Sequence, residues 1–225
     1  MATFRGTNRA DILNGTALAD SLFGLGNIDV MNGANGNDRM FGGTGNDVMS
    51  GGNGNDFMKG EVGNDTMRGN NNNDVMDGGS GNDRLFGGTG NDRMIGGAGS
   101  DRLIGDAGND QLFGGDGSDL LSGGEGNDII DGGRGADSLT GGGGADIFRF
   151  DDQSSPSVFA SLDVITDFAR GFDKIDAVGF FTIQNGITFT FNGATVVGAR
   201  VDYGVTTANT ILVVGVVNLD ASDII

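Results

Sequence analysis

Aspartate recurs every nine residues through the first two thirds of the chain, and this spacing is the strongest chemical signal in the sequence. The series runs from Asp11 to Asp146 without a missed step, sixteen residues in all. A glycine lies five residues before each of these aspartates, and an apolar residue lies two residues after it. Carboxylates repeated at a fixed interval among glycine-rich turns are oxygen donors for a hard cation rather than a catalytic pair. We therefore expect rows of metal sites.

The composition excludes most other chemistry. The 225 residues include no His and no Cys, so the usual zinc ligands, an imidazole base, a thiol nucleophile and disulfides are all absent. The formal net charge of -18 repels nucleic acids and anionic membranes and favours a cationic partner. No segment approaches the roughly 18 apolar residues of a membrane span. The N-terminus has no apolar stretch of signal-peptide length.

The repeating unit, exemplified by residues 42–50 (GGTGNDVMS), is predicted to form six turn residues followed by a three-residue strand. Gly and Asn in the turn tolerate positive φ. Side chains alternate along a strand, so we expect Met49 to point inward and Val48 and Ser50 to point outward. The inward position is apolar in every unit. This regularity predicts a continuous core and argues against a disordered, low-complexity linker.

Two units return the chain to its starting side, so one coil contains 18 residues and the sixteen units make about eight coils. At about 4.8 Å between strands, the stack is about 38 Å long. The aspartates then form two rows, one on each flank. Two carboxylates at strand spacing repel by roughly 1 kcal/mol even in water, so a cation is needed between them. Calcium fits best because it accepts six to eight oxygens in loose geometry, and its binding should be coupled to folding.

The unit resembles the nonapeptide G-G-x-G-x-D-x-U-x of the RTX (repeats-in-toxin) proteins, and the likeness covers residues 6–149. The resemblance implies an all-β fold, a right-handed parallel β-roll (a β-solenoid), with calcium between consecutive loops and with aspartate side chains and loop carbonyls as ligands. Two rows of eight loops have fourteen gaps, and discounting the end loops leaves roughly a dozen Ca2+ ions. By position the ligand role falls on Asp29, Asp38, Asp47, Asp56, Asp65, Asp74, Asp83, Asp92, Asp101, Asp110, Asp119, Asp128, Asp137 and Asp146.

Some loops depart from this nonapeptide. Glu61, Asn70 and Asp106 occupy the position of the second glycine, whereas Asn27 and Asn72 replace the later one. The loops of Asp11 and Asp20 have Arg9 and Leu18 at this later position, where all other loops have Gly or Asn. These first two loops are therefore expected to form an end cap rather than metal sites.

Composition changes near residue 150, which divides the chain into a predicted calcium-binding β-roll (1–150) and a C-terminal segment (151–225). The second segment has seven Phe and only seven Gly. Asn185-Gly186 and Asn192-Gly193 each lie between β-prone runs and predict hairpin turns. A small β-rich cap would cover the exposed strand edges at the end of a solenoid, which is one purely structural role for this segment.

A second resemblance gives the same segment another role. ADIFRF (145–150), DVITDF (163–168), GFDKIDA (171–177) and the ending DII (223–225) are similar to the region after the repeats in serralysin-type exoproteins. This resemblance implies an uncleaved secretion signal read by a type I (ABC transporter) exporter, and hence a secreted, extracellular protein. Such a chain would stay unfolded at low cytosolic calcium and fold outside the cell.

Other functions remain as alternatives. RTX arrays often follow a hydrolase domain, but the repeats begin at Gly6 and no nucleophile and base pair is evident, so we do not expect an enzyme. An ice-binding solenoid would need a uniform ladder, which the irregular third position of the repeat does not provide. Adhesion or assembly of an extracellular matrix or biofilm, through an unknown partner, is the main alternative, because Phe23, Phe41 and Phe57 are expected to point outward on one flank.

Overall fold

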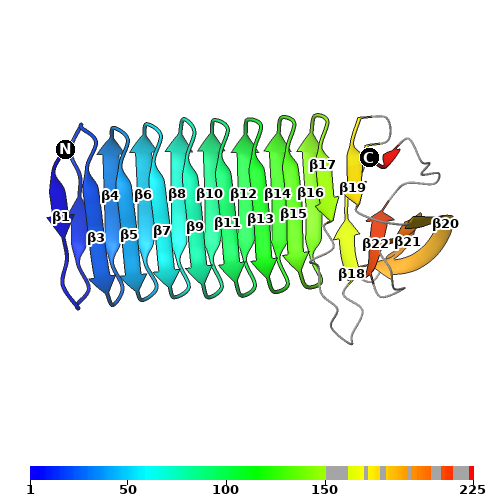
Figure 1. Ribbon diagram of the computed structural model, residues 1–225, viewed down its shortest axis with the longest axis horizontal. Coiled ribbons are helices and arrows are strands. Elements are labelled where there is room, and N and C mark those ends of the chain that lie inside the picture. The colour runs from blue at the N-terminus through cyan, green and yellow to red at the C-terminus, as the bar shows by residue number, and fades with distance from the viewer. Residues whose placement is uncertain (151–161, 170–171, 178–180, 192–193, 204–208, 215–222) are drawn as a thin grey trace.

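The protein is described by a computed structural model that covers residues 1–150, 162–169, 172–177, 181–191, 194–203, 209–214 and 223–225. These residues form 22 strands (Figure 1). They contain no helix that is long and apolar enough to cross a membrane. The strands are β1 (Thr3–Arg5), β2 (Ile12–Asn14), β3 (Ser21–Gly26), β4 (Val30–Asn35), β5 (Arg39–Thr44), β6 (Val48–Asn53), β7 (Phe57–Val62), β8 (Thr66–Asn71), β9 (Val75–Ser80), β10 (Arg84–Thr89), β11 (Arg93–Ala98), β12 (Arg102–Ala107), β13 (Gln111–Asp116), β14 (Leu120–Glu125), β15 (Ile129–Arg134), β16 (Ser138–Gly143), β17 (Ile147–Phe150), β18 (Leu162–Ile165), β19 (Lys174–Ala177), β20 (Phe181–Phe191), β21 (Ala194–Tyr203) and β22 (Asn209–Val214).

The strands alternate between two sheets. Odd-numbered strands β1 to β19 form sheet A, and even-numbered strands β2 to β18 form sheet B, which continues through β22, β21 and β20. Every pair within the roll is parallel and joins residues 18 apart, as Leu85 with Leu103 in sheet B and Met94 with Leu112 in sheet A. The predicted parallel β-roll with an 18-residue coil is therefore confirmed, and the coils follow one another along the long axis (Figure 1).

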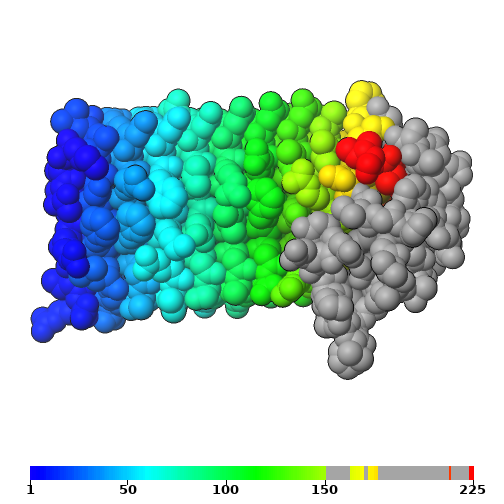
Figure 2. Space-filling model, in the orientation of Figure 1, coloured from blue at the N-terminus to red at the C-terminus, as the bar shows by residue number. Residues whose placement is uncertain are grey.

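The core is a double row of apolar side chains between the two sheets. From Leu22 to Phe148, the residue two positions after each repeat aspartate is at most 1% exposed. Val48 is exposed on one side of Met49 and Ser50 is half-buried on the other, as the alternation along the strand predicts. Each coil contributes only two such side chains. Figure 2 shows the coils packed against one another without a hollow between them on the face in view.

The strands are longer than the sequence suggests. The prediction of three-residue strands and six-residue turns is wrong, because most strands of the roll contain six residues, as in β6 and β10. The glycine-rich half of each unit joins the ladder: Gly88 and Thr89 pair with Asp106 and Ala107 on the next coil. Stacking in register lets these backbones form inter-strand hydrogen bonds even where φ is positive.

The described C-terminal residues continue the two sheets. β18 pairs with β16, and β19 pairs with β17. The hairpin predicted at Asn192-Gly193 agrees with the antiparallel pairing of β20 and β21 on either side of it, although residues 192–193 themselves lie outside the described residues. The hairpin predicted at Asn185-Gly186 is wrong, because β20 runs through this dipeptide with a shift in register. A glycine inside a strand often marks such a bulge.

Candidate metal sites

Each repeat aspartate lies in the turn that precedes a strand and reaches toward the coil before it. From Asp29 onward, its Oδ1 atom accepts a hydrogen bond from the backbone N–H of the aspartate 18 residues earlier. Asp92 accepts from Asp74 at 2.7 Å, and Asp110 accepts from Asp92 at 2.7 Å. The two rows of aspartates predicted from the 18-residue coil are thus joined by a ladder of side-chain to backbone hydrogen bonds on each flank.

The other backbone N–H groups of the turn are also occupied. In the turn 63–65, Gly63 donates to the carbonyl of Ser80 at 2.9 Å, Asn64 donates to Oδ1 of Asn46 at 2.9 Å, and Asp65 donates to Oδ1 of Asp83 at 2.7 Å. The asparagine contact repeats along the roll. The sequence reasoning missed this role of asparagine, although the recurring Asn-Asp dipeptide was a visible signal.

The second carboxylate oxygen, Oδ2, is left without a donor in fourteen of these aspartates. In each of them, from Asp29 to Asp146, Oδ2 is buried and makes no hydrogen bond within the described part of the chain. These fourteen residues are the fourteen selected from the sequence. A buried carboxylate oxygen without a partner is costly, so each site requires either a proton or a cation.

The first glycine of each unit keeps the space beside Oδ2 open. A Cβ atom added to Gly87 would lie 2.7 Å from the carbonyl oxygen of Gly105 on the next coil and would also collide with Oδ2 of Asp92. The same two contacts recur at Gly69, with Asp74 and Gly87. A carboxylate oxygen and a carbonyl oxygen from consecutive coils therefore converge where any side chain would block them, which explains the glycine at this position in every unit.

Burial makes these carboxylates hard to ionise. It raises the pKa of Asp74 to about 8 and that of Asp65 to about 7. The carboxylates 18 residues before and after each residue raise both pKa values further, whereas the backbone hydrogen bond to Oδ1 opposes the rise. A folded roll without bound cations would thus hold protons at neutral pH that the unfolded chain releases.

The first two loops satisfy their aspartates in a different way. Oδ2 of Asp11 accepts hydrogen bonds from the backbone N–H (2.6 Å) and the hydroxyl (2.9 Å) of Thr7. Oδ2 of Asp20 accepts the same pair, each at 2.7 Å, from Thr16. Hydrogen bonds from Ala2 and Thr16 lower the pKa of Asp20. The two aspartates left out of the sequence-based set therefore have their own donors, as expected of an end cap.

Two further aspartates extend the rows beyond the repeats. Asp163 accepts from the N–H of Asp137 at 3.0 Å, and Asp173 accepts from the N–H of Asp146 at 3.0 Å. Oδ2 of Asp173 also accepts from the N–H of Ala169 at 2.7 Å, which closes this row much as Thr16 closes its start. The sequence reasoning missed both residues because their spacing breaks the nine-residue period. Both residues keep the repeat pattern of an aspartate followed two positions later by an apolar residue, here Ile165 and Ile175, which are buried. This pattern could have identified them in the sequence.

The departures at the second glycine position do not change the backbone path. Glu61, Asn70 and Asp106 adopt φ values of 77°, 79° and 71°. Leu25 and Ala34, two departures that the sequence reasoning overlooked, have φ values of 84° and 80°. Positive φ is uncommon for residues other than glycine, so the stacked neighbours impose the turn geometry even where the residue type disfavours it.

The donor set fits calcium better than other biological metals. The available oxygens are carboxylates and backbone carbonyls, which hard cations prefer, and His and Cys are absent from the sequence. No three carboxylates among the described residues come close enough to hold a metal by side chains alone. A cation between two coils would therefore need carbonyl oxygens as well, and calcium accepts such mixed oxygen shells readily.

Comparison with known proteins decides the family. The model of the RTX calcium-binding nonapeptide repeat matches overlapping windows that together cover residues 5–153. This chain belongs to that family. The match to the RTX repeat includes every loop with an unpartnered Oδ2, so the repeat sequence and the geometry of the turns agree.

Solved structures resemble the RTX chain only loosely. The AlgE6R3 subunit of the mannuronan C5-epimerase of Azotobacter vinelandii is 28% identical, with a TM-score of 0.30, over 60% of this chain and 77% of that one. The extracellular lipase LipA of Serratia marcescens is 17% identical, with a TM-score of 0.27, over 94% of this chain and 39% of its own length. No curated protein matches by sequence. TM-scores this low support no functional conclusion.

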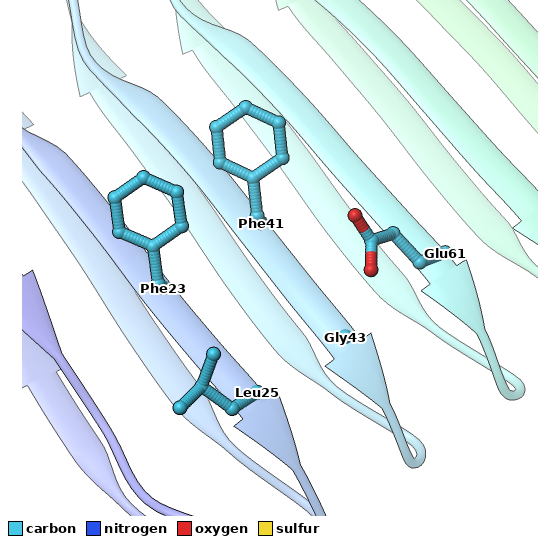
Figure 3. A pocket seen from close by; sticks show the side chains of 5 residues that line it. All are labelled: Phe23, Leu25, Phe41, Gly43 and Glu61. Carbon is cyan, nitrogen blue, oxygen red and sulfur yellow. The ribbon is translucent and has the colours of Figure 1, made fainter.

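The aromatic residues considered for adhesion lie together on sheet A. The rings of Phe23 and Phe41 stack with centroids 5.2 Å apart, and Phe57 lies 5.8 Å from Phe41 at a tilt. Phe23 and Phe41 also line a surface pocket with Leu25 and Glu61 (Figure 3). All three rings are half-buried against one another and their neighbours. They therefore expose less apolar surface than the sequence alone suggests.

Proposed function

We propose that this protein is a calcium-binding RTX β-roll in which the fourteen aspartates from Asp29 to Asp146 are ligands. The observation that carries the proposal is their buried, unpartnered Oδ2 atom. Because the turn amides already have acceptors, such as Oδ1 of Asn46 and of Asp83, the backbone of the turn supplies no further donor for Oδ2. A divalent cation between two loops would meet this need and would also offset the repulsion between carboxylates.

In this proposal each part of the turn has a separate role. Oδ1 of the aspartate accepts a hydrogen bond from the preceding coil, and Oδ1 of the asparagine before it accepts one from the next coil. Oδ2 faces the cation together with loop carbonyls. Bound calcium supplies two positive charges per gap, and roughly a dozen ions would occupy the roll. Because each site is made of two coils, calcium binding and coil stacking are one equilibrium.

We further propose that the chain is exported by a type I secretion system and acts outside the cell. The threadable, unfolded state at low cytosolic calcium and the folded state at millimolar calcium would make export directional. Residues 151–225 would serve as both cap and secretion signal. In the folded chain Asp223 and Ile224 are buried, and Ile225 donates to the carbonyl of Ile175 at 2.9 Å, so the signal would be readable only before folding.

We assign the chain a binding role and no catalytic one. The buried polar groups in the described residues are aspartates and Ser21, and the repeat aspartates among them are arranged as a uniform ladder rather than as a nucleophile with a base. Any partner of the folded protein would then bind to the outer faces of the two sheets.

Two measurements test this function. Isothermal titration calorimetry of the full chain should give many calcium ions per chain, with midpoints between about 0.1 mM and a few millimolar; a stoichiometry near zero would refute the calcium role. Co-expression with a type I exporter should place the full chain in the medium, and deletion of residues 151–225 should retain it in the cell. Export of the deletion variant at an unchanged level would refute the signal assignment.

A further inference from the structure

Four cationic side chains on the outer face of sheet A have partners within that sheet: two contact carboxylates, and Arg39 and Arg93 lie over aromatic rings. On sheet A, Lys59 contacts Asp77 of the next coil at 2.7 Å, and Arg149 contacts Asp176 of β19 at 3.4 Å. The members of each pair occupy the same column in register. Sheet A thus pairs these cations with carboxylates on its own surface.

No such ion pair is found among the described residues of sheet B. Arg84 on β10 pairs in register with Arg102 on β12, so two exposed arginine residues occupy neighbouring positions on this face. Neither forms an ion pair with another described residue. Along the roll, none of the sixteen residues in the two outward columns of sheet B is acidic: Ile12, Val30, Val48, Thr66, Arg84, Arg102, Leu120, Ser138 and Asn14, Asn32, Ser50, Arg68, Phe86, Ile104, Ser122, Thr140.

The same face carries exposed apolar side chains in line with these arginines. Ile12, Val30 and Val48 are 75%, 44% and 39% exposed and occupy consecutive positions of one column, and Leu120 is 41% exposed on the far side of Arg102. In the second column the guanidinium of Arg68 lies 5.1 Å from the ring centre of Phe86. Two acidic residues of the roll strands of sheet B, Asp106 and Glu125, lie near the C-terminal ends of β12 and β14, outside both columns.

We propose that the outer face of sheet B binds a linear acidic polysaccharide that lies along the roll axis. Like charges directly opposite each other on neighbouring strands are unfavourable, so the Arg84–Arg102 pair favours an anionic counterpart. The columns repeat at about 4.8 Å, which suits a chain of regularly spaced charged units better than a single small anion. Phe86, Ile104 and the apolar column provide surfaces for the C–H faces of sugar rings.

This interaction rests on the proposed calcium role, because calcium would also change the charge of the whole protein. The chain alone has a net charge of -18, which repels any polyanion. Twelve divalent ions would add about 24 positive charges and bring the net charge to about +6. The calcium-loaded roll would then no longer repel a polyanion at long range. The polyanion would bind at the arginine residues on the outer face of sheet B.

The test compares two pairs of arginines in the full chain at millimolar calcium. Fluorescent dextran sulfate is the probe, and uncharged dextran of equal length is its control. Arg84→Gln with Arg102→Gln removes the sheet B pair. The matched control, Arg39→Gln with Arg93→Gln, removes the same charge from sheet A, where Arg39 and Arg93 lie against Phe57 and Phe113. Circular dichroism confirms that each variant folds at the calcium concentration of the parent.

We expect the sheet B variant to bind dextran sulfate about tenfold more weakly and to lose about two units of the salt-dependence slope, while the sheet A variant changes by less than about twofold. Equal losses in both variants, or equal binding of uncharged dextran, would overturn the proposal. Stronger binding to phosphatidylglycerol vesicles or to single-stranded DNA would also overturn it, in favour of a lipid or nucleic-acid partner. A folded, calcium-loaded chain that binds no polyanion would refute this inference and leave the calcium role intact.

Discussion

Replacing Asp74 with Asn should have opposite effects on folding with and without calcium. The side chain lies between Asp56 and Asp92, to which it is linked by hydrogen bonds of 2.8 and 2.7 Å, and burial raises its pKa to about 8. Two carboxylates about 4.8 Å apart repel by about 0.9 kcal/mol at the dielectric constant of water and by about 3.5 kcal/mol at an effective value of 20. The metal-free roll must either keep the charge of Asp74 between these two carboxylates or protonate its side chain, and Asn avoids both costs, so this roll should gain at least about 2 kcal/mol.

Calcium reverses the sign of this effect. Asp74 would contribute to the sites on both of its sides, so Asp74→Asn should remove up to two ions from the calorimetric stoichiometry and raise the calcium midpoint. In excess chelator, the same variant should fold at a lower concentration of trimethylamine N-oxide than the parent, since osmolytes favour the compact state. Far-ultraviolet circular dichroism reports both transitions.

The control is Asp116→Asn, which removes the same formal charge from an exposed position, 3.6 Å from Arg134. It should leave both transitions within about 0.5 kcal/mol of the parent. If Asp74→Asn impedes folding in chelator as well as in calcium, repulsion between the stacked carboxylates is not the dominant cost in the metal-free roll, and the reasoning fails.

The remaining predictions address the register, the end cap and the effect of pH. Asp92→Ala with Asp110→Ala, which truncates two neighbours in one row, should raise the calcium midpoint seen by circular dichroism, and an unshifted midpoint would contradict the 18-residue stacking. Thr16→Val removes one hydrogen bond to Asp20 and should lower hydrogen-exchange protection of the first coils by about 1 kcal/mol at constant calcium stoichiometry; a lost ion would show that this loop also binds calcium. In chelator, the raised pKa of Asp65, about 7, means that the folded chain binds more protons than the unfolded one. This contribution to stability is complete below the ordinary aspartate pKa and is lost as pH rises through about 7. Ellipticity should therefore indicate more β structure at pH 5 than at pH 8, and the opposite trend would be contrary to the burial of these groups.

Strict periodicity made the roll and its candidate ligands predictable. The aspartate and the apolar residue keep the same spacing in every nine-residue unit. The apolar residues can all be buried only if two units form one coil, and this arrangement places residues 18 apart in contact. Met49 and Asp47 could be assigned on this basis alone. Fourteen aspartates were separated from Asp11 and Asp20 because the loops of these two have Arg9 and Leu18 where the others have Gly or Asn. The structure shows that Thr7 and Thr16 donate to Oδ2 of these two aspartates.

The strand lengths, the last two aspartates of the rows and the turn conformations depend on contacts between coils, which the conformational preferences of single residues do not predict. Six-residue strands arise because stacked glycines pair with their neighbours, although glycine is a poor strand former. Asp163 and Asp173 join the rows at intervals that a nine-residue search skips. Leu25 takes a positive φ of 84° because the coils on either side of it hold the turn. Asn185-Gly186 makes a bulge instead of a hairpin because β20 has a long antiparallel partner in β21.

The central claim is that the stacked carboxylates require divalent cations for the roll to form. Far-ultraviolet circular dichroism of the purified full chain at neutral pH, first in excess chelator and then during a calcium titration, tests it most directly. We predict a coil-like spectrum in chelator and cooperative gain of β structure as calcium reaches the millimolar range. A stable β spectrum in chelator that calcium leaves unchanged would contradict the claim.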